Sequence, residues 1–478
     1  MESYDKLYIN GQWRYGRGST LLENHDPYTG QLLYSYHGAS IDDLNDAFRA
    51  AEAAQPGWAA LLPNEKQNYL TRLYDAIAFY KEDIFELLTH EAGSIRAKAE
   101  FEYHTCLEFV REAMSYPHML EGRILPSTTP GKDNYIFKEP KGVIAVIAPW
   151  NVPLVLAMRS VIPAIATGNT VVLKPASDTP GSAFLIARIF ERAGFPAGVF
   201  NAIAGKGSEI GDAMITHPTP SLVSFTGSTE VGSRVGELAV SRFKDVSLEL
   251  GGNNVMIVVD DADIDHAAAA AAFGAFFNQG QVCMAINRII VMAKVYERFV
   301  EAFVAKVKEL PIGDPRDAQT FIGPMISASQ VASVEKLIEE TVAAGAVVAL
   351  AGHTEGNIIT PWIFKDVTME MSAAANEVFG PVCCVIKSRD VDEAVDIANS
   401  SEHGLSGSIF TRDLYRGMMI GKRVKTGMIH INDQTINDEP HVMFGGEKAS
   451  GIGRFNGKWV VDKFTTDRWI SVQRQYRF

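Results

Sequence analysis

The stretch GVIAVIAPWNVPLVLAMRSVIPAIATGNTVVLKP, residues 142–175, decides the fold. It opens with an apolar run (142–149), continues through a helical stretch, and closes with a second β-branched run (169–175). Short apolar runs of this kind, separated by a helix, are typical of strands buried within a sheet. The stretch is therefore predicted to be a strand–helix–strand unit of a doubly wound α/β protein.

The same alternation continues on both sides of this unit. GVFNAIAG (198–205) and SLVSFTG (221–227) are predicted strands, and a helix capped by Ser228 or Thr229 follows them. A second set of strands and helices runs from NNVMIVVDD (253–261) to GMIHIND (427–433). We expect two α/β domains that meet near residues 249–254. The segment 119–140 is expected to be irregular, and the C-terminal RWISVQRQYRF to be extended.

Composition restricts the possible partners. The 478 residues carry a formal net charge of −13, which argues against nucleic acid or an anionic membrane as the main ligand. The most apolar segment, 142–173, is interrupted by prolines and polar residues, so it is predicted to be buried core. The N-terminus lacks a secretory pattern, and the four cysteines have no metal-ligand spacing. We expect a cytoplasmic protein without a metal ion.

Three residues are candidates for chemistry, each with a plainer alternative. Cys283, in GQVCMAINR, can be a nucleophile if its thiolate is accessible and stabilised; otherwise it is an inert buried cysteine. Glu249, in LELGGNN, can be a general base, or simply a surface carboxylate at a strand end. Asn151, in APWNVP, can be a rigid oxyanion donor, or an amide that only satisfies its loop.

Two further motifs are candidates for binding a ligand. Lys174 ends the predicted strand in VVLKPAS, and the carboxyl ends of parallel strands face the ligand crevice of open α/β sheets. FTGSTEVG (225–232) combines strand, glycine turn and helix start, which presents backbone N–H groups to a phosphate. It lacks the GxGxxG fingerprint, so by itself it is a weak signal.

Together, the motifs resemble those of the aldehyde dehydrogenase superfamily, in the family's order and over essentially the whole chain. Those that carry the resemblance are APWNVP, LKPAS, FTGSTEVG, LELGGNN, GQVCMAINR, EVFGPV (377–382) and FGGEKASGIGR (444–454). The C-terminal INDEPHVMFGG and FTTDRWISVQ further resemble the benzaldehyde and vanillin dehydrogenase branch.

The resemblance implies a mechanism for the three candidates. Cys283 would attack the aldehyde to form a thiohemiacetal, with the oxyanion held by Asn151 and by the backbone N–H of Cys283. A hydride then leaves to the nicotinamide, and water activated by Glu249 hydrolyses the thioester to the carboxylic acid. The soft nucleophile, neutral donor and mobile carboxylate suit these roles.

The resemblance also implies a cofactor site for NAD or NADP. Lys174 would bind the adenosine ribose, Ser228 the pyrophosphate, and Glu377 and Phe379 the nicotinamide ribose and ring. The other expected cofactor residues are Gly207, Gly227, Gly232, Pro149 and Trp150. Family members that prefer NAD often carry Glu where this chain has Ser177. An acidic residue there repels the 2′-phosphate of NADP, so its absence predicts that NADP is accepted, alone or alongside NAD.

An aromatic aldehyde is the expected substrate, by resemblance to the branch named above. The tunnel would include Arg159, Phe277, Val282 and Phe444, and flat apolar walls suit a ring. Arg159 would meet a ring hydroxyl or, equally, form a structural salt bridge to the catalytic domain. An aliphatic aldehyde or succinic semialdehyde remains an alternative, since Arg159 could also bind a carboxylate. A catalytically silent relative is a remote alternative because Cys283 and Glu249 are both present. Esterase chemistry would be a side activity.

The resemblance assigns an architecture and an assembly. We expect a Rossmann-type cofactor domain over 1–121 and 141–250, an α/β catalytic domain over 251–450, and a small β oligomerisation element formed by 122–140 and 460–478. This element implies a homodimer or homotetramer.

Overall fold

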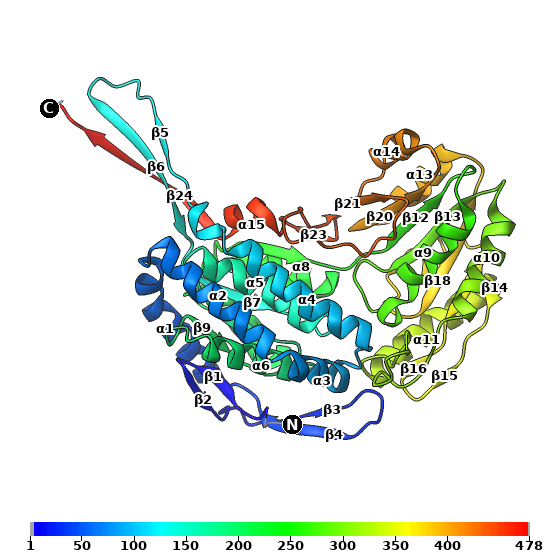
Figure 1. Cartoon of the computed structure of the whole chain (residues 1–478), viewed down its shortest axis with the longest axis horizontal. Helices are drawn as coiled ribbons and strands as arrows, with labels where there is room; N and C mark the ends of the chain where they lie inside the picture. Colours follow the sequence, from blue (N-terminus) through cyan, green and yellow to red (C-terminus); the bar gives the residue numbers. More distant parts are fainter. Residues whose placement is uncertain (1–3, 477–478) are drawn as a thin grey trace.

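Residues 4–476 are described by the computed structural model, and they form two large sheets that lie side by side, with helices packed against them (Figure 1). The first sheet has the order β2-β1-β9-β8-β7-β10-β11-β23. Its strands are β1 (Leu7–Ile9), β2 (Gln12–Arg14), β7 (Val143–Ile147), β8 (Thr170–Lys174), β9 (Phe200–Ala202), β10 (Leu222–Thr226), β11 (Asp245–Glu249) and β23 (Gly451–Ile452). The predicted strand–helix–strand unit is confirmed as β7, α5 (Pro153–Ala166) and β8.

The order of the first sheet places the ends of β7 and β10 side by side. The chain runs from β7 to β8 and β9 on one side, and then returns to add β10 and β11 on the other. These five strands are parallel, and most of their β-branched residues are buried. The direction of strand addition therefore reverses at β7, and ligands of open α/β sheets bind beyond the carboxyl ends at such a point.

The second sheet has the order β14-β17-β18-β13-β12-β20-β21. Its strands are β12 (Asn254–Val258), β13 (Ile286–Met292), β14 (Val347–Leu350), β17 (Trp362–Lys365), β18 (Val382–Ser388), β20 (Ser406–Phe410) and β21 (Met428–Ile431). Successive residues of β12 point to opposite faces, so that Ile257 and Val258 belong to two separate cores. This burial on both faces explains the continuous apolar runs in the sequence.

Helices cover both sheets. Those around the first sheet are α1 (Ile41–Ala59), α2 (Pro63–Phe79), α3 (Lys81–Ala92), α4 (Arg96–Ala113), α5, α6 (Pro180–Arg192), α7 (Asp212–Thr216), α8 (Thr229–Val240) and α15 (Gly457–Lys463). Those around the second are α9 (Ile264–Phe276), α10 (Tyr296–Lys308), α11 (Ala328–Ala343), α12 (Ser372–Ala375), α13 (Val391–Asn399) and α14 (Leu414–Gly421). Short pairs are formed by β3 (Leu21–His25) with β4 (Leu32–His37), β15 (Thr354–Glu355) with β16 (Ile358–Ile359), and β19 (His403–Gly404) with β22 (Glu447–Lys448). No helix of residues 4–476 is long and apolar enough to cross a membrane.

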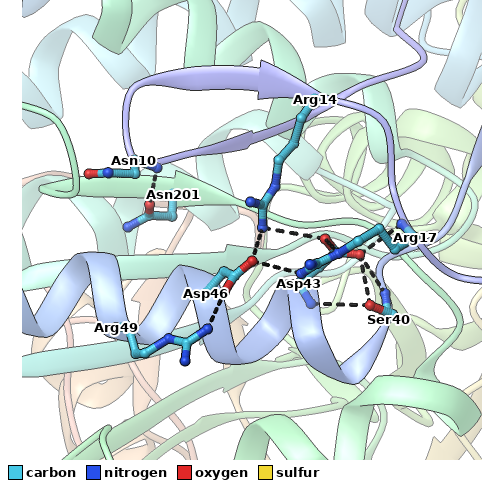
Figure 2. Close-up of polar contacts among 8 residues, drawn as sticks. All are labelled: Asn10, Arg14, Arg17, Ser40, Asp43, Asp46, Arg49 and Asn201. Atoms are coloured by element: carbon cyan, nitrogen blue, oxygen red, sulfur yellow. Dashed lines mark hydrogen bonds and ion pairs between the residues drawn. The ribbon is translucent and has the colours of Figure 1, made fainter.

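The N-terminal strands are joined to α1 by a cluster of charged groups (Figure 2). Ser40 caps the helix by accepting from Asp43 N, and the Asp43 carboxylate accepts in return from Ser40 N at 2.9 Å. Arg17 donates to Asp43 from its backbone N and from Nε, both at 2.8 Å, and Arg14 donates to Asp46 at 2.8 Å. Capping-box partners satisfy helix N–H groups that would otherwise lack an acceptor, so this cluster fixes where α1 starts.

The segment 119–140 was expected to be irregular, and that expectation is wrong. It contains β5 (Arg123–Leu125) and the nine-residue β6 (Lys132–Pro140), which pairs along its whole length with β24 (Thr465–Gln473). Figure 1 shows these three strands projecting away from both large sheets. Because most of their side chains are exposed or half-buried, no apolar alternation marks them, and a partner more than 300 residues away defines the strand. Residues 1–3 and 477–478, the ends of the expected N-terminal and oligomerisation regions, lie outside the described residues.

Candidate active site

Asn151 lies in the loop between β7 and α5, at the reversal point of the first sheet. The side chain is 5% exposed, and its Nδ2 donates to the Gln281 carbonyl oxygen at 3.1 Å. Glu102 supports this loop from α4, because its Oε2 accepts from Leu154 N at 2.9 Å and Val155 N at 3.2 Å. One N–H of the amide is thus engaged in holding the side chain still, and the second remains for a ligand.

Ser228 follows β10 and starts α8. Its side chain accepts from Val231 N at 3.4 Å, which confirms the predicted N-cap. The preceding Gly227 is confined, since a Cβ there would lie 2.5 Å from the Phe225 ring. The start of a helix directs unpaired N–H groups and positive potential toward whatever lies in front of it, which favours an anion.

Glu249 ends β11 and is only 1% exposed, so the surface alternative is wrong. Its Oε1 has no hydrogen-bond partner in the described part of the chain. Burial raises the pKa of this carboxyl to about 7, against the opposing attraction of Arg159 and Lys463. A carboxyl that titrates near neutrality can take and release a proton under working conditions.

Cys283 lies in a loop that the amides of residues 278–281 hold in place. Asn278 and Gln279 adopt left-handed backbone conformations, with φ of 51° and 57°. Gln279 donates to Pro324 O at 2.8 Å and accepts from Gly323 N at 3.0 Å, while Gln281 Oε1 accepts from Ile326 N at 3.1 Å. These contacts offset the strain and position the cysteine.

The thiol itself is half-buried and free, so it remains accessible from one side. Loss of solvation raises the pKa of Cys283, and the Glu249 carboxylate raises it further. The resting side chain is therefore a neutral thiol. The neighbouring Val282 and Met284 are buried, and the segment packs into the core of the first sheet although it leads into β13 of the second. This crossing brings the cysteine to Asn151 and Glu249.

Glu377 reaches the site from the loop before β18. Its Oε1 accepts from Gly252 N at 2.9 Å, and burial raises its pKa to about 7. The two glycines of LELGGNN make this approach possible, because a Cβ on Gly251 would lie 2.2 Å from Glu377 Oε2. Phe379 follows with a φ of 52°, and its ring meets Trp150 edge-on at 5.4 Å between centroids.

These residues line one cavity of about 220 Å³. Polar groups, two aromatic rings, a helix start and the Cys283 thiol all face the same space, and this set fits a nicotinamide dinucleotide, which carries anionic phosphates, ribose hydroxyls and a flat ring. The lining residues are Pro149, Trp150, Asn151, Leu156, Thr226, Gly227, Ser228, Glu249, Leu250, Gly251, Cys283, Gln330, Glu377 and Phe379.

A second cavity begins on the other side of Cys283 and contains only about 30 Å³ of free space. Its lining is almost wholly apolar apart from Lys98, Arg159 and Asp438. The full set is Lys98, Phe101, Val152, Val155, Leu156, Arg159, Phe277, Val282, Cys283, Met284, Ile436, Asp438 and Phe444. All four residues predicted for the substrate tunnel are therefore brought together here.

Arg159 is 4% exposed and forms an ion pair with Asp438. The predicted structural salt bridge is thus present, and its partner, in the loop after β21, lies within the range predicted for the catalytic domain. The guanidinium also stacks on Phe444, with 4.0 Å between Cζ and the ring centroid. Its Nε and Nη1 have no hydrogen-bond partner among the residues that the structure describes.

Four predicted cofactor residues are not among those that line the two cavities beside Cys283. Lys174 ends β8, 4% exposed, and its ammonium donates to Pro175 O at 3.1 Å; burial lowers its pKa to about 8. Ser177 is exposed and lines a separate hollow with Glu23, Asp26 and Asp178. Gly207 starts an exposed turn, and Gly232 lets α8 pack on Leu250, where a Cβ would lie 2.2 Å from Cδ2.

Some lining residues escaped sequence reasoning. Gln330 on α11 and Lys98 and Phe101 on α4 come from segments far from the motifs, and nothing in their local sequence marks them. Asp438 lies within INDEPHVMFGG, but only the fold shows that its carboxylate lines the cavity. No group of three or more His, Cys, Asp or Glu side chains within residues 4–476 is placed to hold a metal ion.

Comparisons with known proteins agree with this geometry. The model of the aldehyde dehydrogenase family matches residues 13–470. A vanillin dehydrogenase of Corynebacterium glutamicum is 48% identical over 98% of both chains. A benzaldehyde dehydrogenase of Bacillus subtilis is 47% identical over 100% of this chain and 98% of its own. The crystal structure of an NAD-dependent benzaldehyde dehydrogenase from Corynebacterium glutamicum superposes with a TM-score of 0.92, at 44% identity, over 99% of this chain and 97% of that one.

The fold, the cavity around a free cysteine and the full-length matches lead to one conclusion. The chain belongs to the aldehyde dehydrogenase family.

Proposed function

We propose that this protein oxidises an aromatic aldehyde to the carboxylic acid with NAD or NADP. The observation that carries the proposal is that Cys283 lines two cavities, one with the polar groups and helix start that fit a dinucleotide, and one that is almost wholly apolar and includes Phe101, Phe277 and Phe444. The similarity to vanillin and benzaldehyde dehydrogenases supports the same substrate class.

Cys283 is the proposed nucleophile and Asn151 the oxyanion donor. Addition of the thiol to the aldehyde forms the carbon–sulfur bond and passes the thiol proton to the aldehyde oxygen, which carries negative charge while the thiohemiacetal forms. The Asn151 N–H that is not bound to Gln281 O can donate to that oxygen. Because the amide is already held, it needs little reorganisation as charge develops.

Glu249 is the proposed base for hydrolysis of the resulting thioester. Its carboxylate accepts a proton from a water molecule as the water oxygen attacks the thioester carbon. The carbon–sulfur bond then breaks, and Cys283 leaves as the thiolate. The unpartnered Oε1 leaves the carboxylate a free lone pair for that water. With a pKa of about 7, Glu249 is ionised above neutrality and protonated below it.

The residues of the first cavity are proposed to hold the cofactor. The helix start at Ser228 would meet the pyrophosphate, Glu377 the nicotinamide ribose, and Phe379 the ring. Lys174, at the end of β8, is proposed for the adenosine ribose; Pro149, Trp150, Gly207, Gly227 and Gly232 shape the surrounding backbone. When bound, the nicotinamide supplies the two-electron acceptor of the oxidation.

Both NAD and NADP are proposed to be accepted. Ser177 offers no charge to repel a 2′-phosphate, which supports use of NADP. The carboxylates of Glu23, Asp26 and Asp178 line the same hollow and favour the cofactor without that phosphate. We infer that NAD binds more tightly and that NADP supports slower turnover.

The walls of the second cavity favour a ring over a chain that ends in a charge. Phe277 and Phe444 offer flat faces for aromatic contact. The two cations there already have carboxylate partners, Arg159 with Asp438 and Lys98 with Glu102. The carboxylate of succinic semialdehyde would have to compete with these partners for the two cations. The free Nε and Nη1 of Arg159 can instead donate to a ring hydroxyl or ether oxygen.

The three projecting strands are proposed to join copies of the chain into a homodimer or homotetramer. Trp469 is 62% exposed, and Ile124, Phe137 and Val472 are also exposed on this small sheet. Large apolar side chains on a projecting sheet are typical of an interaction surface. The four free cysteines support a reducing compartment, and we propose the cytoplasm.

An assay of reduced-nicotinamide formation tests the function. Benzaldehyde and vanillin should be oxidised faster than hexanal or succinic semialdehyde, with either cofactor, and Cys283→Ala should abolish turnover. Cys106→Ala is the matched control, because that free cysteine lies buried in α4 and lines neither cavity. Preference for succinic semialdehyde would contradict the aromatic assignment, and turnover by Cys283→Ala would contradict the mechanism.

A further inference from the structure

Lys463 is the last residue of α15, and its ammonium group contacts β11 of the first sheet. Its Nζ donates to Ser247 Oγ and lies 3.2 Å from the centroid of the Phe455 ring. Within residues 4–476, no carboxylate forms an ion pair with this ammonium. Lys463 is half-buried, and a cation that loses part of its hydration without a counter-charge is costly, so its retention calls for a reason.

The backbone makes room for this side chain. β23 runs antiparallel to β11, pairing Gly451 with Glu249 and Ile452 with Leu248, so the next residue, Gly453, follows beside Ser247. A Cβ on Gly453 would lie 3.4 Å from Lys463 Nζ and 3.8 Å from Ser247 Oγ. The absence of a side chain at Gly453 leaves the path along which the lysine reaches the strand.

Ser247 and Glu249 share one face of β11. They are two residues apart on the strand, so their side chains point the same way, about 7 Å apart along it. The ammonium bound to Ser247 therefore enters the face from which the Glu249 carboxylate projects. That carboxylate has an Oε1 without a partner, just as the ammonium lacks a carboxylate.

Of the cations around Glu249, Lys463 is the one without an ion-pair partner among residues 4–476. Arg159 on α5 pairs with Asp438, and Arg454 in the loop before α15 pairs with Glu447. Asp438 is held further by Asn456, whose Nδ2 donates to Oδ1 at 2.8 Å. Two unpaired groups of opposite sign remain on the strand face beside the nucleophile.

We propose that Lys463, held by Ser247, is a positioning residue that stabilises the ionised form of Glu249 and so sets the pH range of thioester hydrolysis. The kinetic part of this inference rests on the proposed role of Glu249 as base; the electrostatic coupling between the two side chains does not.

The titration of both groups supports the coupling. Burial raises the pKa of Glu249 to about 7, and among the opposing influences Arg159 and Lys463 lower it while Asp438 raises it. Burial lowers the pKa of Lys463 to about 7, with Glu249 opposing that shift and Arg159 and Arg454 adding to it. Removing the lysine charge should therefore raise the pKa of Glu249, so that Glu249 becomes protonated at a higher pH than in the unaltered protein.

The test follows the titration of Glu249 by infrared difference spectroscopy of its protonated carboxyl group. The band of this group is the one that disappears in Glu249→Gln. In the full-length protein, Lys463→Met and Lys463→Gln should move the midpoint up by about one pH unit. Lys463→Arg should keep it near the original value. Single-turnover hydrolysis of the acyl-enzyme below pH 7 should slow about tenfold and recover at higher pH, while acylation of Cys283 is unchanged.

Lys244→Met is the matched control. Lys244 is buried and directly precedes β11, about 16 Å along the strand from Glu249. Its ammonium donates to His217 O. Its loss should leave the midpoint in place. If Lys463→Met fails to fold, Lys463→Gln carries the test, because it keeps a donor for Ser247 and removes only the charge. An unmoved midpoint in a folded Lys463 variant overturns the proposal. A moved midpoint together with normal hydrolysis by Glu249→Gln would keep the coupling and reject Glu249 as the base.

Discussion

The two cavities that meet at Cys283 are built in different ways. The cofactor-side cavity is formed largely by loops at the ends of β7, β10 and β11, where polar side chains such as Asn151, Ser228 and Glu249 lie among apolar ones. The substrate-side cavity is formed by large side chains from α4, α5 and the loop after β21, and little free space remains in it. The first therefore presents polar groups at the ends of strands, and the second is shaped by mostly apolar side chains.

This difference predicts which variants change the rate for all aldehydes and which change the selectivity among them. Variants on the cofactor side should slow every aldehyde to the same degree, because Asn151 and Glu249 face groups that all substrates share. Variants on the substrate side should change the ratio between aldehydes, because Arg159, Phe277 and Phe444 face only what differs. A cofactor-side variant that altered the ratio would break the comparison.

The largest effect is expected for Glu249→Gln. Hydrolysis of the thioester should fall about 10²–10⁴-fold for all aldehydes, because the amide cannot take a proton from water. The first turnover, seen as a burst of reduced nicotinamide in stopped flow, should survive. In the unaltered protein, kcat should decline as pH falls through about 7, where the carboxylate becomes protonated. Loss of the burst would show that Glu249 acts before the thioester.

Asn151→Ala should come next, with kcat/KM lowered about 10²–10³-fold for benzaldehyde and vanillin alike. The oxyanion would lose its side-chain donor while Cys283 and Glu249 remain. Asn287→Ala is the control, since that buried amide donates to Asn376 O at 3.1 Å and lines neither cavity. Equal losses in the two variants would mean that loop stability, not the donor, is responsible.

On the substrate side, Arg159→Met should change the ratio of kcat/KM for vanillin over benzaldehyde by about tenfold, with a smaller change in kcat for benzaldehyde. The single variant leaves Asp438 buried without its cation, so thermal unfolding must be compared in parallel. The double variant Arg159→Met with Asp438→Asn removes both charges and isolates the effect on selectivity. An unchanged ratio in both variants would leave Arg159 with a structural role alone.

The smallest effect is expected for Ser177→Glu, which adds a carboxylate to a hollow outside both cavities. The kcat/KM for NADP relative to NAD should fall about fivefold, because an exposed charge is screened by solvent. Selectivity among aldehydes should not change. A strong NAD preference in the original protein that Ser177→Glu left untouched would contradict the role of this position.

The sequence by itself determined the alternation of strands and helices, the parallel cores and the motif residues. Each of these depends on local properties: β-branched runs bury on both faces, Ser228 caps its own helix, and glycines allow close backbone approach. For the same reason, the residue types and their neighbours make Cys283, Glu249 and Asn151 candidates, each with a plainer alternative, and the resemblance of the ordered motifs to a family assigns their roles.

Only the tertiary structure decided what those residues meet. Glu249 is compatible with a surface carboxylate until β23, from the far end of the chain, pairs with β11 and the surrounding layers bury it. Likewise, β6 becomes a strand through pairing with β24, and Asp438, Lys98 and Lys463 reach the site from distant segments. Burial, ion pairing and the resulting pKa shifts depend on contacts between residues hundreds of positions apart, and a local sequence pattern carries no record of those contacts.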